Sequence, residues 1–85
     1  MEEIKYVITD PLGLHARPAG QLVKQANAFE CNIQLGTAVK MVDAKRIMGV
    51  MGLSLKQGNE ITLTFDGDDE VLAAKEMKAF LAENL

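Results

Sequence analysis

One short run contains the side chains best suited to chemistry in this chain. The only histidine, His15, lies in the run Gly13-Leu14-His15-Ala16-Arg17-Pro18, after a glycine-containing turn and directly before a predicted helix. A free imidazole has a pKa of about 6.5, so at neutral pH it is largely uncharged and nucleophilic. His15 is therefore the candidate nucleophile.

The residues after His15 favour an anion as its substrate. A helix start offers unpaired backbone N–H groups and the positive end of the helix dipole, which together bind phosphate. Pro18 has no N–H, so the donors near the imidazole are those of Ala16 and Arg17, and the Arg17 guanidinium can grip phosphate oxygens. Such a site can carry a phosphoryl group on nitrogen and release it again. The simpler alternative is a surface His beside a surface Arg, which is common in soluble proteins.

Other chemistries have less support. No second histidine exists, and the single cysteine, Cys31, lies sixteen positions from His15, so no metal site is expected. A Ser–His or Cys–His hydrolase needs a pocket that excludes water, which a chain this small does not supply. We expect neither a metal nor a cofactor, and no stand-alone enzyme.

Length and composition limit the remaining possibilities. The 85 residues, 48% apolar and 25% charged, are typical of one folded domain spanning residues 1–85, and we expect a monomer. The net charge of −3 argues against nucleic acid, and no apolar run approaches the roughly 20 residues that span a bilayer. Residues Met1 to Lys5 are acidic where a secretory signal is basic, so the predicted location is the cytoplasm. Cys31 is expected to be a small buried or half-buried side chain.

The positions of apolar residues predict seven elements. Alternation predicts strands at Glu3–Thr9 and Glu60–Phe65, and apolar runs predict strands at Asn32–Leu35 and Ala38–Val42, joined by a two-residue turn at Gly36-Thr37. The only aromatics that these strands offer, Tyr6 and Phe65, are expected to alternate with the core.

Spacings of three and four residues predict three helices. They cover Ala16–Phe29, Arg46–Leu53 and a C-terminal segment that follows Asp68, Asp69 and Glu70 and buries Val71, Ala74, Met77 and Leu81. Four half-buried strands covered by helices on one face make a two-layer α+β domain.

The run Ile47-Met48-Gly49-Val50-Met51 is a second feature of interest. Methionines on a short helix are ordinarily core residues, but a helix of two turns cannot bury every face. We therefore expect some of Ile47, Met48 and Met51 to be exposed, as suits a surface that meets several partners.

These two motifs together resemble HPr, the histidine-containing phosphocarrier family of the bacterial phosphoenolpyruvate-dependent sugar phosphotransferase system. The resemblance rests on the run around His15 and on Lys45-Arg46-Ile47-Met48-Gly49-Val50-Met51, and it extends over the whole chain. It implies an open-faced β-sandwich with a four-stranded antiparallel sheet in the order 1-4-2-3, covered on one face by three helices.

The resemblance also implies a function. Nδ1 of His15 is expected to take a phosphoryl group from phosphorylated enzyme I and pass it to the IIA domains of sugar permeases, which supports carbohydrate uptake. Arg17 is expected to stabilise the phosphoryl group, and the Ala16 amide to donate to it. The implied docking residues are Ala16, Gly20, Lys24, Ile47, Met48 and Met51, with basic side chains, among them Lys45, around an apolar centre.

The chain departs from many relatives at Arg46. Many Gram-positive members carry a regulatory serine there, and Arg46 cannot accept that phosphate, so the regulatory serine site is absent from this chain. Arginine also places positive charge near the positive end of a short helix, and either Asp43 compensates it or Arg46 points toward a partner carboxylate. A smaller departure is Leu12, where many relatives have a polar residue.

Two other functional classes are alternatives to the carrier. One is a regulatory HPr-like interaction module without phosphate, or a paralogous carrier such as a nitrogen-linked one. The other is an RNA-binding α+β domain, which needs exposed stacking aromatics and basic residues on its sheet.

Overall fold

The computed structural model, which describes residues 1–85, contains four strands and three helices in the predicted order. The strands are β1 (Glu2–Val7), β2 (Asn32–Gly36), β3 (Met41–Asp43) and β4 (Glu60–Asp66). The helices are α1 (Ala16–Asn27), α2 (Ile47–Met51) and α3 (Glu70–Asn84). None of the helices is long and apolar enough to cross a membrane.

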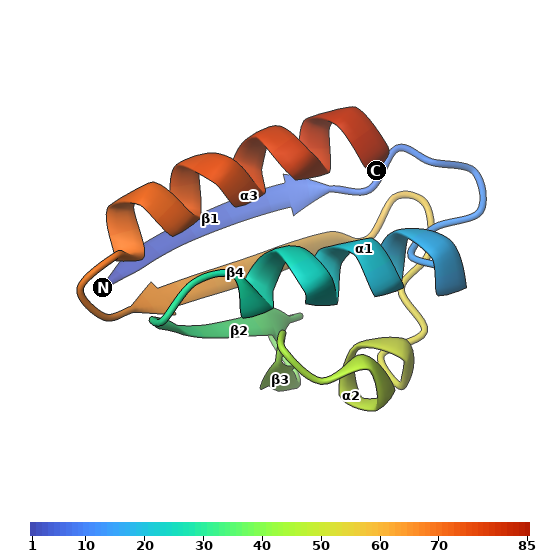
Figure 1. The fold of residues 1–85 in the computed structure, drawn as a ribbon. Coiled ribbons are helices and arrows are strands. Elements are labelled where there is room, and N and C mark those ends of the chain that lie inside the picture. The colour runs from blue at the N-terminus through green and yellow to red at the C-terminus, as the bar shows by residue number, and fades with distance from the viewer.

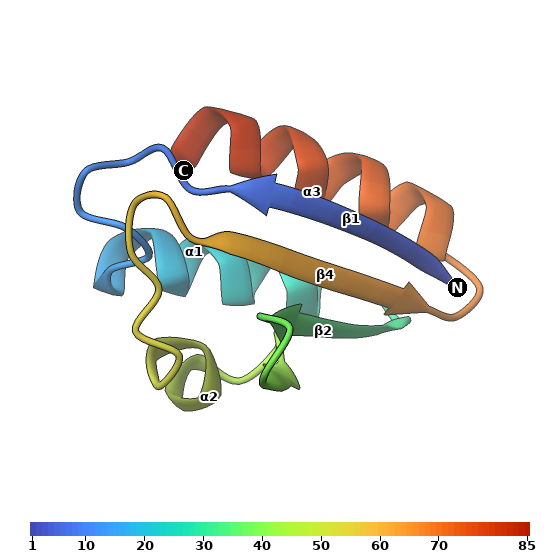
Figure 2. The same cartoon turned by 180° about the vertical axis from the view of Figure 1, so that it is seen from behind.

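The strands form one antiparallel sheet in the order β1-β4-β2-β3, as expected. Figure 1 shows α1 and α3 lying across one face of this sheet, and Figure 2 shows the other face free of helices. The short helix α2 packs against α1 and β3. This arrangement is the open-faced α+β sandwich that the resemblance implied.

The core lies between the sheet and the two long helices. Alternate residues of the central strands point into it, and their register brings Leu63 of β4 opposite both Ile4 of β1 and Leu35 of β2. Strand alternation works here because successive side chains point to opposite faces. The fully buried core includes Leu22, Ala26, Ile33, Leu35, Ile61, Leu63, Phe65, Met77 and Leu81.

The expectation for the two strand aromatics is wrong. Phe65 is fully buried, and Tyr6 is half-buried against the core, so both belong to the helix-covered side of the sheet. Neither ring is offered on the open face for stacking with a base.

The predicted hairpin turn is also misplaced. Gly36 belongs to β2, where it pairs with Met41 of β3. The turn is closed by a hydrogen bond from the Thr37 N–H to the Lys40 carbonyl oxygen at 2.9 Å. Val39 lies in this turn and is 94% exposed. Its apolar side chain predicted a strand position, but Val39 lies at the tip of the turn, where it pairs with no neighbouring strand.

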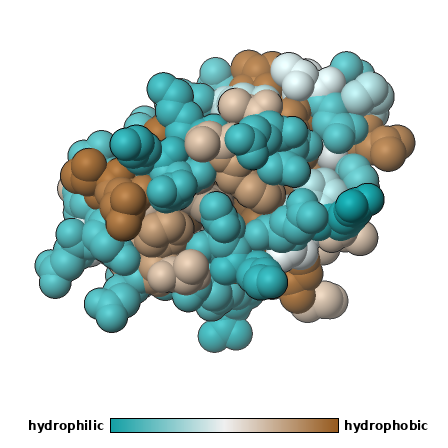
Figure 3. Space-filling view, turned by 45° about the horizontal axis from the view of Figure 1, so that its top comes forward, coloured by the Kyte–Doolittle hydropathy of each residue, from teal (hydrophilic) through white to brown (hydrophobic).

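The prediction for the buried face of α3 is wrong at one residue. Val71 is 67% exposed, whereas Ala74, Met77 and Leu81 are buried as predicted, together with Ala73. Leu72 is exposed as well, and Figure 3 shows apolar side chains scattered among polar ones over the side of the molecule that carries α3.

Asp69 connects the start of α3 to the segment before β2, which is distant in the sequence. It occupies the N-cap of α3 without capping that helix through its side chain. Its carboxylate instead accepts hydrogen bonds from the backbone N–H groups of Glu30 (2.8 Å) and Cys31 (2.9 Å), which hold its pKa below the usual value. Cys31 is buried, as predicted, and burial with the nearby Asp69 carboxylate raises the pKa of its thiol to about 11.

Candidate functional site

His15 begins the helix that its sequence context predicted. It is the N-cap of α1, with extended backbone angles (φ −98°, ψ −176°), and its carbonyl oxygen accepts the Ala19 N–H at 3.0 Å. The imidazole does not cap the helix, and 39% of the side chain is exposed. The ring is therefore held at the helix start while its nitrogens stay accessible.

Two backbone donors are free beside His15. The N–H groups of Ala16 and Arg17 find no acceptor in the protein, Pro18 has none to offer, and no acidic side chain occupies the first turn of α1. Unpaired N–H groups at the positive end of a helix attract an anion. The Arg17 side chain is exposed and takes part in none of the three ion pairs of the protein, so its guanidinium is also available.

His15 and Arg17 lie together at a shallow hollow of about 240 Å³, in which Pro18 is the one apolar lining residue. The residues that line it are Asp10, His15, Arg17, Pro18, Gln21 and Asn84. Sequence reasoning missed Asp10 and Asn84. Asp10 stands only five residues before His15 in a turn, but Asn84 is distant in sequence and no pattern marks it.

The loop before His15 is fixed at both ends. The main-chain oxygen of Leu85 accepts the Asp10 N–H at 2.8 Å and the Thr9 hydroxyl at 2.8 Å, and Figure 1 shows the end of α3 beside this loop. At the other end Gly13 has a φ of +67°, and a Cβ there would lie 2.5 Å from the Leu55 carbonyl oxygen. Only glycine fits such a conformation and such a close approach.

The second motif forms an apolar surface next to α1. Ile47 is 40%, Met48 82% and Met51 37% exposed, while Val50 is buried, so the expected exposure of this helix is confirmed. A groove of about 450 Å³ runs between the helices, lined by Ile47 and Met48 of α2 and by Val23 of α1. The residues predicted to meet partners, Gly20, Lys24, Ile47, Met48 and Met51, are all exposed, and we refer to this predicted set as the docking surface.

The basic residues near the docking surface differ in their freedom. Lys24 and Arg17 are exposed on α1, whereas the Lys45 amine donates to the Phe29 carbonyl oxygen at 2.7 Å. Arg46, the N-cap of α2, has its Nε 3.8 Å from Asp43 Oδ2 and remains 81% exposed. Asp43 therefore lies close enough to offset part of the Arg46 charge, while the guanidinium stays exposed and within reach of a partner.

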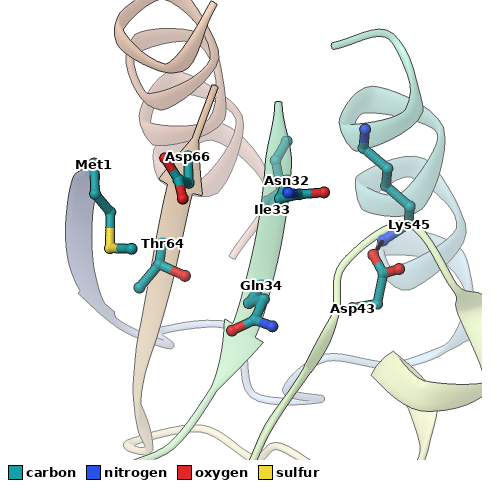
Figure 4. Close-up of a pocket in the computed structure, with 8 residues that line it drawn as sticks. All are labelled: Met1, Asn32, Ile33, Gln34, Asp43, Lys45, Thr64 and Asp66. Carbon is teal, nitrogen blue, oxygen red and sulfur yellow. Dashed lines mark hydrogen bonds between the residues drawn. The ribbon is translucent and has the colours of Figure 1, made fainter. Parts of the chain in front are cut away.

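A second polar hollow, of about 290 Å³, lies on the open face of the sheet and is shown in Figure 4. Side chains of neighbouring strands, such as Gln34 and Thr64, point into it, and Lys45 and Asp43 lie at one side. It includes neither His15 nor Arg17, so the candidate site and this hollow are separate.

Comparison with known proteins identifies the family. A family model described as "PTS HPr component phosphorylation site" matches residues 2–83. The chain belongs to the HPr family. Members of this family are phosphocarriers of the phosphotransferase system rather than stand-alone enzymes.

Individual HPr proteins are similar over nearly the full length. The phosphocarrier protein HPr of Lysinibacillus sphaericus is 45% identical over 83 residues, which cover 98% of this chain and 94% of that protein. The histidine-containing phosphocarrier protein of a Mycoplasma is 39% identical, with a TM-score of 0.93 and coverage of 96% and 93%.

A structure of HPr from Thermoanaerobacter tengcongensis is 40% identical, with a TM-score of 0.92 and coverage of 98% of this chain and 93% of that one. A second structure of the Thermoanaerobacter protein is a dimer and superposes with a TM-score of 0.77. The fold is therefore that of HPr, and at least one HPr has been solved as a dimer.

Proposed function

We propose that this protein accepts a phosphoryl group on Nδ1 of His15 from phosphorylated enzyme I and passes it to the IIA components of sugar permeases. The observation that carries the proposal is the position of His15 at the start of α1, beside two unpaired N–H groups and the unpaired Arg17 guanidinium. We expect the protein to do this as a monomer in the cytoplasm.

The step itself is a displacement at phosphorus. The lone pair of Nδ1 forms a bond to phosphorus while the bond from phosphorus to the donor breaks, and the donor keeps that electron pair. The N–H groups of Ala16 and Arg17 and the Arg17 guanidinium offset the negative charge on the phosphoryl oxygens. Because these donors are already in place, little reorganisation is needed when charge develops.

Exposure of the site suits a carrier. His15 lies in an open hollow and not in an enclosed cavity, so donor and acceptor proteins can reach the same imidazole in turn. The docking surface lies next to it, with an apolar centre at Met48 and a cation at Lys24 for partners of acidic character.

The direct test is phosphorylation by enzyme I and phosphoenolpyruvate, followed by mass spectrometry. We expect one acid-labile phosphoryl group on wild-type protein and none on His15→Ala, with the melting temperature of this variant close to that of wild type because His15 is not a core residue. Wild-type protein that stays unmodified while a known HPr is labelled would overturn the proposal.

The acceptor branch needs a separate measurement. Phosphorylated protein is mixed in parallel with a sugar-specific IIA domain and with the corresponding domain of a nitrogen-linked system, and the transfer rates are compared. Faster transfer to the sugar domain is the expected result, and faster transfer to the other domain assigns the chain to the paralogous branch.

Size-exclusion chromatography at the same concentrations reports whether the protein is a monomer.

A further inference from the structure

We propose that Asp10 is a positioning residue for phosphoryl transfer. Its carboxylate keeps the proton of neutral His15 on Nε2 and so leaves the Nδ1 lone pair free for phosphorus. This inference rests on the proposed function and adds a residue to the site.

The two side chains face each other across the hollow. Asp10 Oδ2 lies 4.0 Å from His15 Nε2, an ion-pair distance, and both residues line the hollow that also holds Arg17. The side chains are 29% and 39% exposed, respectively, so water screens their interaction in part. The carboxylate approaches the ring on the nitrogen that does not accept the phosphoryl group.

Three hydrogen bonds fix Asp10 in this position. Its N–H donates to the main-chain oxygen of Leu85 at 2.8 Å, and its carbonyl oxygen accepts the Gly13 N–H at 2.9 Å. Its Oδ1 accepts the Leu12 N–H at 2.8 Å. Because Oδ1 is occupied within the loop, Oδ2 is the oxygen left to face His15.

A carboxylate in this place selects one form of the neutral ring. At 4.0 Å the carboxylate accepts no hydrogen bond from the ring, but its negative charge attracts an N–H dipole and so favours a proton on the nearby nitrogen, Nε2, and a lone pair on Nδ1. When Nδ1 bonds to phosphorus, that proton stays on Nε2 and the ring becomes positive, with Asp10 beside the charge. When the phosphoryl group leaves, the electron pair returns to Nδ1 and the same neutral form is restored.

The test compares two variants of Asp10 with a charge control. Asp10→Asn keeps an oxygen for the Leu12 N–H and turns an NH₂ donor toward Nε2, which reverses the preference of the ring. Asp10→Ala removes donor and acceptor alike. Glu83→Gln removes the same charge from an exposed residue of α3 next to the loop of Asp10.

The first readout is the share of neutral His15 that carries its proton on Nε2, measured by ¹⁵N NMR on the unphosphorylated proteins in alkaline solution. Relative to wild type, we expect this share to fall in Asp10→Asn and to stay unchanged in Glu83→Gln. In Asp10→Ala it should lie between the values of wild type and Asp10→Asn. Equal shares in wild type and Asp10→Asn, with both proteins folded, would overturn the inference.

The second readout is the rate of phosphoryl acceptance from enzyme I. We expect kcat to fall about two- to fivefold in Asp10→Asn, the size typical of a partly exposed ion pair, with KM unchanged because Asp10 is not on the docking surface. Wild-type protein that takes no phosphoryl group contradicts the proposed function. A labelled wild type with an Asp10→Asn variant of equal kcat contradicts only the role of Asp10.

Discussion

The N–H of Leu14 donates a hydrogen bond to the carbonyl oxygen of Leu55 at 3.0 Å. This bond joins the loop that carries His15 to the segment that follows α2, and both leucine side chains are buried. A main-chain hydrogen bond thus ties the loop of the first motif to the chain just after the second motif.

Gly13 and Gly20 are expected to respond to alanine in opposite ways. Gly13→Ala places a Cβ against Leu55 at a φ of +67° and should cost at least about 1 to 2 kcal/mol of unfolding free energy. Gly20→Ala adds a methyl to a helix position where nothing lies within 4 Å, and should stabilise the protein by about 0.5 to 1 kcal/mol. Urea unfolding of both variants measures this, and a loss of stability in Gly20→Ala would contradict it.

Met48 and Met77 offer a matched test of surface against core. Met77 is fully buried, so Met77→Ala should cost about 2 to 5 kcal/mol of unfolding free energy. Met48 is 82% exposed, so Met48→Ala should change stability by less than about 0.5 kcal/mol and instead raise the KM for enzyme I. An unchanged KM would remove Met48 from the docking surface.

Arg17→Lys keeps the positive charge but loses the planar fork of the guanidinium. Because a lysine cannot grip two phosphoryl oxygens at once, we expect the rate of phosphoryl acceptance to fall about tenfold or more. Rapid-quench measurement of labelled protein gives this rate, with Lys75→Arg at an exposed position of α3 as the matched exchange away from the site. A wild-type rate in Arg17→Lys would show that charge alone suffices.

Asp69 is expected to make stability depend on acid pH. Hydrogen bonds from Glu30 and Cys31 lower its pKa in the folded protein, so its contribution is complete above the ordinary carboxyl pKa of about 3.9 and is lost as pH falls through the lower folded value. Asp69→Asn should therefore be less stable than wild type at pH 7, and the difference should shrink below about pH 4.

Urea titrations at several pH values measure this difference. Asp68→Asn is the control, because Asp68 is exposed and accepts no hydrogen bond in the protein. A difference between wild type and Asp69→Asn that stays constant across the acid range would contradict the prediction.

Cys31 is expected to be unreactive in the folded protein. Burial raises the pKa of its thiol to about 11, so at pH 8 very little reactive thiolate is present and reagents cannot reach it. Its reaction with a thiol reagent should be at least about 100-fold slower than in denaturant. Similar rates in both states would show that the segment around Cys31 opens readily.

Local patterns in the sequence predicted the order of the elements, the alternation along β4 and the start of α1 after His15. These follow from local rules: alternation along a strand, three- and four-residue spacing along a helix, and a proline in a first turn. That part of the set Ile47, Met48 and Met51 is exposed followed from the shortness of α2, and the burial of Cys31 followed from its residue type. Strand order, in contrast, came from the resemblance to HPr.

Tertiary structure alone decided which distant groups meet. Apolar Val39 and Val71 satisfy local patterns but lie outside the core, because burial depends on what packs above a residue and not on its type. The Asp69 carboxylate accepts a hydrogen bond from the Cys31 N–H. The main-chain oxygen of Leu85 accepts the Asp10 N–H and so holds Asp10 near His15. No spacing in the chain encodes such contacts, since they exist only when the sheet brings the two ends of the sequence together.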